Sequence, residues 1–228
     1  MPYIDNNQTA LSIINTVLLR LGVSTVSSLS QNKQSIMAVG LLNDVIDDIG
    51  DFGTGKWPQL YTEDQEALVS GEAEYKLNYD LKTLEEVAVS GQVQAMLPVT
   101  VEEIRRLNRT NSLGTPRFYA GVSVSGLAMY IRVHPRPNIN SDLLVAYYTK
   151  PVLVRASSGD NGTVLPFPAT LITQGLYAAM LLEQGGGSPT NESLAAATLY
   201  NKMKNETYNR YTSDTGTDIQ FVPYNGRS

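Results

Sequence analysis

Four aspartates form the densest group of chemically capable side chains near the start of the sequence. Their spacing of i, i+3, i+4 and i+7 places all four on one face if the segment is helical. Neighbouring carboxylates could bind a hard cation or repel a polyanion. The alternatives are therefore a solvated helix face and a negatively charged channel wall, and nothing in the sequence supplies the apolar pocket that a catalytic pair needs. The four are Asp44, Asp47, Asp48 and Asp51.

A glycine-rich segment follows them. Residues 50–56, GDFGTGK, match the first seven positions of a phosphate-binding P-loop. The eighth position should be Ser or Thr to hold Mg²⁺, but this chain has Trp57. A P-loop also follows a strand and begins a helix, whereas this segment ends an expected helix. We interpret it as a glycine-rich helix exit.

Residue counts restrict the remaining chemistry. The chain has one histidine and no cysteine, which excludes disulfides, thiolate nucleophiles and cysteine-ligated metals. A Ser–His–Asp site would need His134, but the Gly-x-Ser-x-Gly motif is absent from the sequence. We expect His134 to be a strand-end imidazole with a hydrogen-bond partner. We therefore expect no catalytic residue, no metal and no cofactor.

A small basic patch is expected on a short helix over residues 101–108. Its arginines are Arg105, Arg106 and Arg109, and Glu102 and Glu103 lie close by. Local ion pairing is one interpretation. The other is contact with an acidic surface of a partner protein.

Composition indicates a globular protein with a modest charge. The 228 residues are 42% apolar and 17% charged, with a formal net charge of −5. That sign disfavours binding driven by counterion release from DNA phosphates. The start of the sequence has no basic signal-peptide region, and no apolar run approaches the ~20 residues of a membrane span. We expect a soluble, intracellular protein with no membrane partner.

The hydrophobic period changes from helical to strand-like and back along the chain. Helices are predicted over residues 8–21, 31–50 and 169–184, and from Pro189 to about Tyr211, with Ser30 and Ser188 as N-caps. Short glycine turns between the strands predict hairpins and a mainly antiparallel sheet. The predicted strands are 58–69, 73–78, 84–90, 92–97, 117–124, 127–134 and 142–149.

This order predicts an α+β fold. We expect the N- and C-terminal helix pairs to form a four-helix bundle, with a mainly antiparallel β domain inserted between them and an extended C-terminal tail. The tail has no periodicity but carries Ile219, Phe221, Val222 and Tyr224. The expected parts are a helical hairpin over 1–55, a β domain over 56–155, a second hairpin over 156–212, and the tail over 213–228.

Several segments, in order, resemble the head-to-tail adaptor proteins of tailed bacteriophages, in particular the tail tubular protein A and tail accessory factor group. One departure is the aromatic cluster after the second helix, which is reduced here to Trp57. The segments are ALSIINTVLLRLGV (10–23), LLNDVIDDIGDFG (41–53), YKL (75–77) before DL (80–81), GTPRFY (114–119), HPRP (134–137), LLVAYYTKP (143–151) and LPFPATLITQGLYAAMLL (165–182).

The resemblance implies a structural role without enzymatic activity. It implies a homo-oligomeric ring, commonly a dodecamer, that docks under the portal protein, extends the DNA channel and receives a downstream nozzle or second adaptor protein. Double-stranded DNA would pass without tight or sequence-specific binding. The helices would surround the channel, with the aspartates facing it, and the tail over 213–228 would contact the portal. The location would be the virion, after assembly in the host cytoplasm.

Two other functions stay open from the residues. A tail-associated cell-wall hydrolase would need two carboxylates across a groove. A tail-platform or carbohydrate-binding β module outside the adaptor group would use its helices only as a pedestal. The acidic residues available to a hydrolase in the β region are Glu63, Asp64, Glu66, Glu72 and Glu74.

Overall fold

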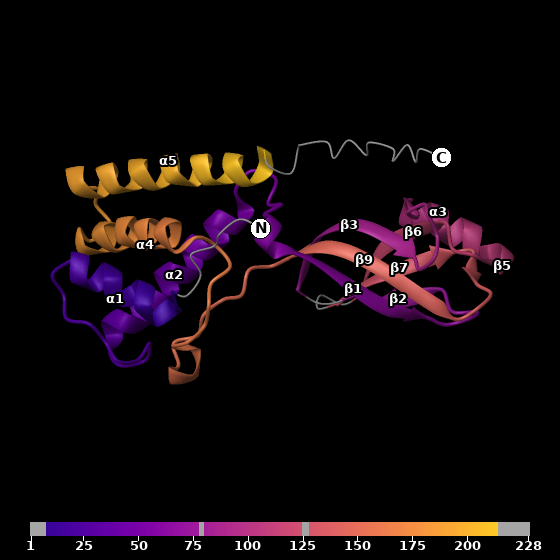
Figure 1. Ribbon diagram of the computed structural model, residues 1–228, viewed down its shortest axis with the longest axis horizontal. Coiled ribbons are helices and arrows are strands. Elements are labelled where there is room, and N and C mark those ends of the chain that lie inside the picture. The colour runs from indigo at the N-terminus through magenta and orange to yellow at the C-terminus, as the bar shows by residue number, and fades with distance from the viewer. Residues whose placement is uncertain (1–7, 78–79, 125–127, 214–228) are drawn as a thin grey trace, which may run out of the picture. The chain divides into compact units, whose positions relative to one another are not determined.

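The computed structural model describes residues 8–77, 80–124 and 128–213 (Figure 1). The tail residues Ile219, Phe221, Val222 and Tyr224 lie outside the described residues. The chain divides into two compact units. A helical unit combines the chain up to residue 59 with the chain from residue 151, and a β unit comprises residues 60–150.

Four long helices build the helical unit, and side-chain caps fix where they begin. Thr9 caps α1, since its side chain accepts a hydrogen bond from the Ser12 amide. Asn32 and Ser35 exchange reciprocal bonds at the start of α2. The helices are α1 (Ala10–Arg20), α2 (Lys33–Asp51), α4 (Ala169–Gln184) and α5 (Asn191–Ser213), with the 3₁₀ turns η1 (Pro58–Leu60) and η3 (Ser158–Asp160) on the segments that leave and re-enter the unit.

The predicted N-caps Ser30 and Ser188 are wrong. Asn32 caps α2, and Thr190 exchanges reciprocal bonds with Ser193 at the start of α5. In both cases a serine three positions later accepts a hydrogen bond from the backbone amide of the capping residue. Two amides are satisfied instead of one, so the reciprocal pair wins over an isolated serine upstream.

The expected four-helix bundle is also wrong. α4 lies between α5 and the pair formed by α1 and α2, and it contacts all three (Figure 1). α1 and α2 contact each other only slightly, although a short connection joins them. The physical reason lies in α4, which buries residues on more than one face, so it serves as a central element and not as one wall of a shared core. Its buried residues are Leu171, Ile172, Thr173, Gln174, Gly175, Leu176, Ala178, Met180 and Leu181.

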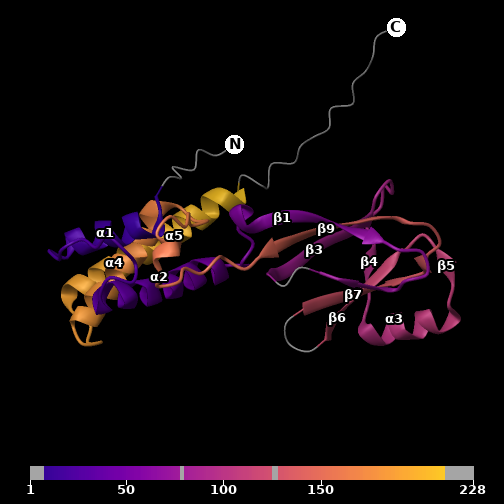
Figure 2. The ribbon, with the colours of Figure 1, turned by 90° about the horizontal axis from the view of Figure 1, so that it is seen from below.

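The β unit is a sandwich of two sheets (Figure 2). The three-stranded sheet has the order β1 (Tyr61–Leu68), β9 (Ser141–Thr149), β3 (Leu81–Val89). The four-stranded sheet has the order β2 (Glu74–Lys76), β7 (Ala128–His134), β6 (Phe118–Val124), β4 (Leu97–Pro98). A small pair joins β5 (Leu113–Gly114) to β8 (Arg136–Pro137). The long pairings are antiparallel, as predicted, and only β4–β6 and β5–β8 are parallel.

One buried cluster joins the two sheets. Ile131 and Val133 of β7 face Val87 of β3 and Val145 of β9 across it, all at most 2% exposed. Because successive strand residues point to opposite faces, the residues between these core positions point outward. Helix α3 (Val101–Leu107) and the turn η2 (Asn108–Thr110) lie on the outer side of the four-stranded sheet (Figure 2).

Three of the predicted hairpins are wrong, because β1 does not pair with β2, β3 does not pair with β4, and β7 does not pair with β9 across residues 138–141. Only β6 and β7 pair with their neighbour in sequence. At Ser70–Gly71 the chain crosses from one sheet to the other, since β1 pairs with β9 and β2 with β7. At Ser90–Gly91 the chain crosses again, since β3 before the turn pairs with β9 and β4 after it pairs with β6. The predicted strand over 92–97 is reduced to the two residues of β4.

Candidate functional site

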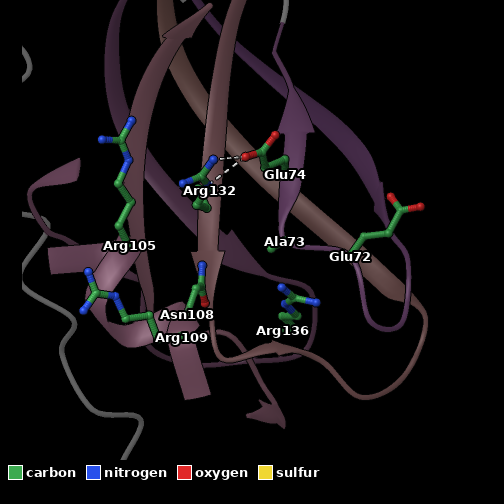
Figure 3. A pocket seen from close by; sticks show the side chains of 8 residues that line it. All are labelled: Glu72, Ala73, Glu74, Arg105, Asn108, Arg109, Arg132 and Arg136. Carbon is green, nitrogen blue, oxygen red and sulfur yellow. Dashed lines mark hydrogen bonds and ion pairs between the residues drawn. The ribbon is translucent and has the colours of Figure 1, made fainter. Parts of the chain in front are cut away.

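An arginine-rich pocket lies on the outer side of the four-stranded sheet in the β unit (Figure 3). Its volume is about 470 Å³. We call it the basic pocket, because four arginines line it beside only two carboxylates. The lining residues are Glu72, Ala73, Glu74, Arg105, Asn108, Arg109, Arg132 and Arg136.

Helix α3 positions two of these arginines. Thr100 caps the helix by accepting a hydrogen bond from the Glu103 amide at 3.2 Å, as predicted. Ile104 is fully buried and fixes the helix against the sheet. Arg105 and Arg109 are four residues apart, so both lie on the same side, where they are exposed and line the pocket.

The third predicted arginine is directed elsewhere. Arg106 does not line the basic pocket, and its guanidinium lies 3.9 Å from the Glu103 carboxylate. Both side chains are exposed, so this pair contributes little to stability. Local pairing therefore applies to Arg106, whereas Arg105 and Arg109 make no ion pair within the described part of the chain.

Strand β7 and the segment after it supply the other two arginines, which the sequence did not single out. Arg132 points outward from β7 and forms an ion pair with Glu74, its cross-strand neighbour on β2. Arg136 has its Nε buried without a hydrogen-bond partner among the described residues. The Glu72 carboxylate points away from the arginines (Figure 3). Arg105 and Arg109 therefore have no ion-pair partner among the described residues, and the Arg136 Nε has no acceptor there. A buried donor without an acceptor lowers the stability of the fold.

His134 lies beneath the pocket and is held by Asn108. Its Nδ1 lies 2.8 Å from the Asn108 Oδ1, and its Nε2 lies 3.4 Å from the Ser112 Oγ. The Asn108 Nδ2 donates to the Val133 carbonyl at 3.2 Å, which leaves the amide oxygen to accept from His134. Burial lowers the pKa of His134. The predicted strand-end imidazole with a hydrogen-bond partner is confirmed.

The aspartate stripe lies on exposed positions of α2, and Asp48 contacts a second helix of the unit. The Asp48 carboxylate accepts from the Lys204 ammonium and the Tyr200 hydroxyl of α5, both at 2.6 Å. Asp44 and Asp47 are exposed, and so is Asp51 at the last position of the helix. The stripe therefore combines one internal contact with a surface of negative charge.

The glycine-rich segment is a helix exit, as predicted. Gly53 and Gly55 have φ values of +66° and +68° immediately after α2. Trp57 is fully buried, with its ring centroid 5.3 Å from that of Phe167 and 5.2 Å from that of Tyr208. The eighth P-loop position is thus part of an aromatic core, and the segment follows no strand.

The carboxylates considered for hydrolysis do not form an isolated acid–base pair. Glu63 accepts a hydrogen bond from the Tyr61 hydroxyl, and Asp64 accepts one from the Tyr147 hydroxyl. Glu74 is paired with Arg132 on the other sheet. In the part of the chain that the structure describes, no three His, Asp or Glu residues gather to hold a metal ion. Likewise, no described helix is long and apolar enough to cross a membrane.

A comparison with family profiles decides which class of protein presents these surfaces. The profile of the SU10 adaptor protein family matches residues 8–224, which includes the helices and strands of both units. The chain belongs to the SU10 adaptor protein family. It is a structural phage head-to-tail adaptor, so the resemblance found in the sequence is confirmed at the level of adaptors. No curated protein matches the chain.

A member of this family has surfaces that bind other proteins. An SU10 adaptor contacts portal and tail proteins in the phage, and its place is the virion. The basic pocket is such a surface, because guanidinium groups bind carboxylates with two parallel hydrogen bonds. Arg132 could have been found in the sequence, since it alternates with the apolar Ile131 and Val133. That Arg132 lies close to α3 could not have been predicted, because it depends on how the strands pair.

Proposed function

We propose that this SU10 adaptor assembles as a ring, a dodecamer, beneath the portal and extends the DNA channel. The observation that carries this proposal is the family match, which spans both compact units and so assigns the adaptor role to the whole chain. The ring would present a platform to a downstream nozzle or second adaptor protein. The narrower likeness to tail tubular protein A stays a prediction.

The charge of the helical unit supports a role around DNA. In our proposal, the exposed Asp44, Asp47 and Asp51 face the channel together with the Asp48 carboxylate. A wall of carboxylates repels phosphates, so DNA would slide past it without tight or sequence-specific binding. Because Lys204 compensates Asp48, the exposed Asp44 and Asp47 would supply much of the repulsion.

The C-terminal segment is the proposed contact with the portal. Residues 213–228 carry four apolar or aromatic side chains in an otherwise polar stretch. Ordering such a segment costs about 1–2 kcal/mol per residue in backbone entropy, so a partner surface must return that free energy. The four are Ile219, Phe221, Val222 and Tyr224. Assembly would take place in the host cytoplasm.

Electron microscopy of the purified chain mixed with portal protein tests the proposal. We expect the full chain to add a ring to the portal and a chain that lacks residues 213–228 to add none. The control is a full-length chain in which the polar residues Thr215 and Thr217 are changed to serine, which should bind like the natural chain.

The fold of each variant is checked through Trp57, the single tryptophan, which is fully buried in the helical unit. Its emission should be the same in the truncated and full-length chains. A truncated chain that still forms the ring would contradict the role of the tail. A full-length, folded chain that never binds the portal would contradict the proposed function itself.

A further inference from the structure

The two outer faces of the β sandwich carry opposite charges. The basic pocket lies on the outer face of the four-stranded sheet, where Arg132 points away from the core between Ile131 and Val133. α3 adds Arg105 and the turn η2 adds Arg109 on the same side (Figures 2 and 3). The outer face of the other sheet therefore lies on the opposite side of the unit.

That opposite face is acidic. Glu63 of β1 and Glu86 of β3 both pair with Ala146 of the central strand β9, so the two carboxylates flank one position. A hollow of about 330 Å³ opens there. Tyr61 and Leu144 line it and are 42% and 41% exposed, which adds apolar contact area beside the charges. We call this surface the acidic face.

The negative charges of the acidic face affect the pKa of Tyr61. Its hydroxyl donates to the Glu63 carboxylate at 2.8 Å. This hydrogen bond, burial, and the negative charges of Glu63 and Glu86 together raise the pKa of Tyr61 to about 12. The hollow is lined by Glu63, Asp64 and Glu86, and no arginine or lysine lines it.

The basic pocket carries positive groups that lack negative partners. Within the described residues, Arg105 and Arg109 make no ion pair, and the buried Nε of Arg136 has no acceptor. Buried donors in native proteins nearly always have partners. A carboxylate inserted into the pocket could form charge-assisted hydrogen bonds with the exposed guanidinium groups of Arg105 and Arg109.

We propose that the basic pocket of one copy receives the acidic face of a second copy of this chain. The inference deepens the proposed function, since it assigns the seam between subunits of the ring. Two different faces on opposite sides of one unit make a heterologous contact, which closes into a ring or continues as an open filament. A contact between like faces would oppose charges of the same sign.

Charge favours a second copy over DNA as the occupant. The net charge of −5 disfavours binding to phosphate backbones, and DNA in the basic pocket would leave the acidic face unmatched. A neighbouring copy compensates both faces at once. An acidic segment of a tail protein is the remaining occupant, and the experiment below distinguishes it.

Site-specific crosslinking tests the seam, because the natural chain has no cysteine. Ala73 lines the basic pocket and Ala88 lines the acidic face, so Ala73→Cys and Ala88→Cys leave every charge in place. A short bis-maleimide should join the two variants, distinguished by a mass tag, in solution and on the portal. Ala95→Cys, on another surface of the β unit, is the matched control.

We expect the Ala73→Cys/Ala88→Cys product to exceed homodimers and the Ala95→Cys product by about tenfold or more. A dominant Ala73→Cys homodimer would overturn the proposal. So would capture of a tail protein by Ala73→Cys without capture of Ala88→Cys, and so would equal yields for all pairs.

Charge reversal tests whether the arginines and glutamates form the contact. Arg105→Glu with Arg109→Glu in the Ala73→Cys partner should lower the yield about tenfold or more. Glu63→Arg with Glu86→Arg in the other partner should do the same, and combining the two reversed partners should restore it. Arg106→Glu and Glu66→Lys lie outside both surfaces and serve as controls, with little change expected.

The outcomes separate this inference from the proposed function. A ring on the portal without the Ala73→Cys/Ala88→Cys product refutes the seam and leaves the adaptor ring standing. The crosslinked product without portal binding supports the seam and refutes the docking. Absence of the product both in solution and on the portal refutes the seam, whether or not a ring forms.

Discussion

Asp48 joins two helices of the helical unit through polar contacts. It lies on α2, and its Oδ2 accepts from the Lys204 ammonium and the Tyr200 hydroxyl of α5, each at 2.6 Å. The Lys204 side chain is only 7% exposed, whereas that of Asp48 is 50% exposed. Burial and the hydrogen bond to Asp48 raise the pKa of Tyr200. The Lys204 charge therefore depends on Asp48 for compensation.

Asp48→Asn removes that compensation while keeping the shape of the side chain. Removing one partner of a fully buried ion pair costs about 3–5 kcal/mol, because an uncompensated charge stays behind. The half-exposed position of Asp48 lets water screen the ammonium in part, which reduces the cost. The Lys204 ammonium also lies 4.9 Å from the ring centroids of Phe52 and Tyr200, which retain some attraction. We expect a loss of about 1–3 kcal/mol in the free energy of unfolding.

Urea unfolding followed by Trp57 emission measures this loss. Trp57 packs against Tyr208 of α5, so its emission reports the packing of that helix. Asp44→Asn makes the same chemical change on the same helix at an exposed position without an ion pair in the described residues. We expect the control to change stability by about 0.5 kcal/mol or less.

A double variant separates the ion pair from the side chains themselves. Asp48→Asn combined with Lys204→Met removes both charges, so it should be more stable than Asp48→Asn with Lys204 retained. The reasoning is refuted if Asp48→Asn loses no more stability than Asp44→Asn. It is also refuted if the two changes are additive, since neighbours in one ion pair should couple.

Two further predictions concern packing and protonation. At Gly175, a Cβ would lie 2.7 Å from both Val45 and the Tyr200 ring, so Gly175→Ala should destabilise by about 1–3 kcal/mol in urea unfolding. Gly40→Ala, with nothing within 4 Å, should instead stabilise by about 0.5–1 kcal/mol, and the same sign for both would contradict the packing argument. Because burial lowers the pKa of His134 below its usual value of about 6.5, the unfolded chain binds the extra proton. The contribution of His134 to stability is therefore full above that pH and is lost as the pH falls below it. Thermal unfolding followed by circular dichroism should show a melting temperature that falls with decreasing pH, and His134→Gln should reduce this dependence. Equal pH dependence in the natural chain and the variant would contradict the reasoning.

Local structure was largely predictable from the sequence, whereas strand pairing was not. Apolar spacing predicted α1, α2, α4 and α5 and most strands to within a few residues. The turns at Ser70–Gly71 and Ser90–Gly91 were found, since Gly71 and Gly91 have φ values of +84° and +78°. A turn fixes a reversal of the chain but not the strand that it then meets. The alternating pattern of β1 suits β9 as well as β2, so the two-sheet topology depends on contacts distant in sequence.

The central position of α4 shows the same limit for helices. Its buried residues include the polar Thr173 and Gln174, and the Gln174 amide donates to the Ala196 carbonyl of α5 at 3.2 Å. A sequence pattern reads both residues as part of a solvated face. Their burial follows only from the packing of three helices around α4, which replaces the predicted bundle.

Two of the four arginines of the basic pocket could be predicted from the sequence, and two could not. Arg105 and Arg109 were found, together with Arg106, because they lie close in sequence at the short helix predicted over residues 101–108. Arg132 and Arg136 were missed, since they reach the same pocket through the pairing of β2 with β7 and of β5 with β8. Their distance from α3 along the chain conceals that all four line one pocket.

The charged groups of this adaptor thus differ in where their partners lie. Asp48 and Lys204 satisfy each other inside the helical unit, so their contribution belongs to folding. Arg105, Arg109 and the buried Nε of Arg136 have no such partner in the described chain, although pairing within the fold would stabilise the monomer. Arg105 and Arg109 are exposed, so water solvates their guanidinium groups, and of the three only the buried Nε of Arg136 lacks both water and a protein partner among the described residues. Arg105 and Arg109 are therefore available to the carboxylates of another protein, as the proposed seam requires.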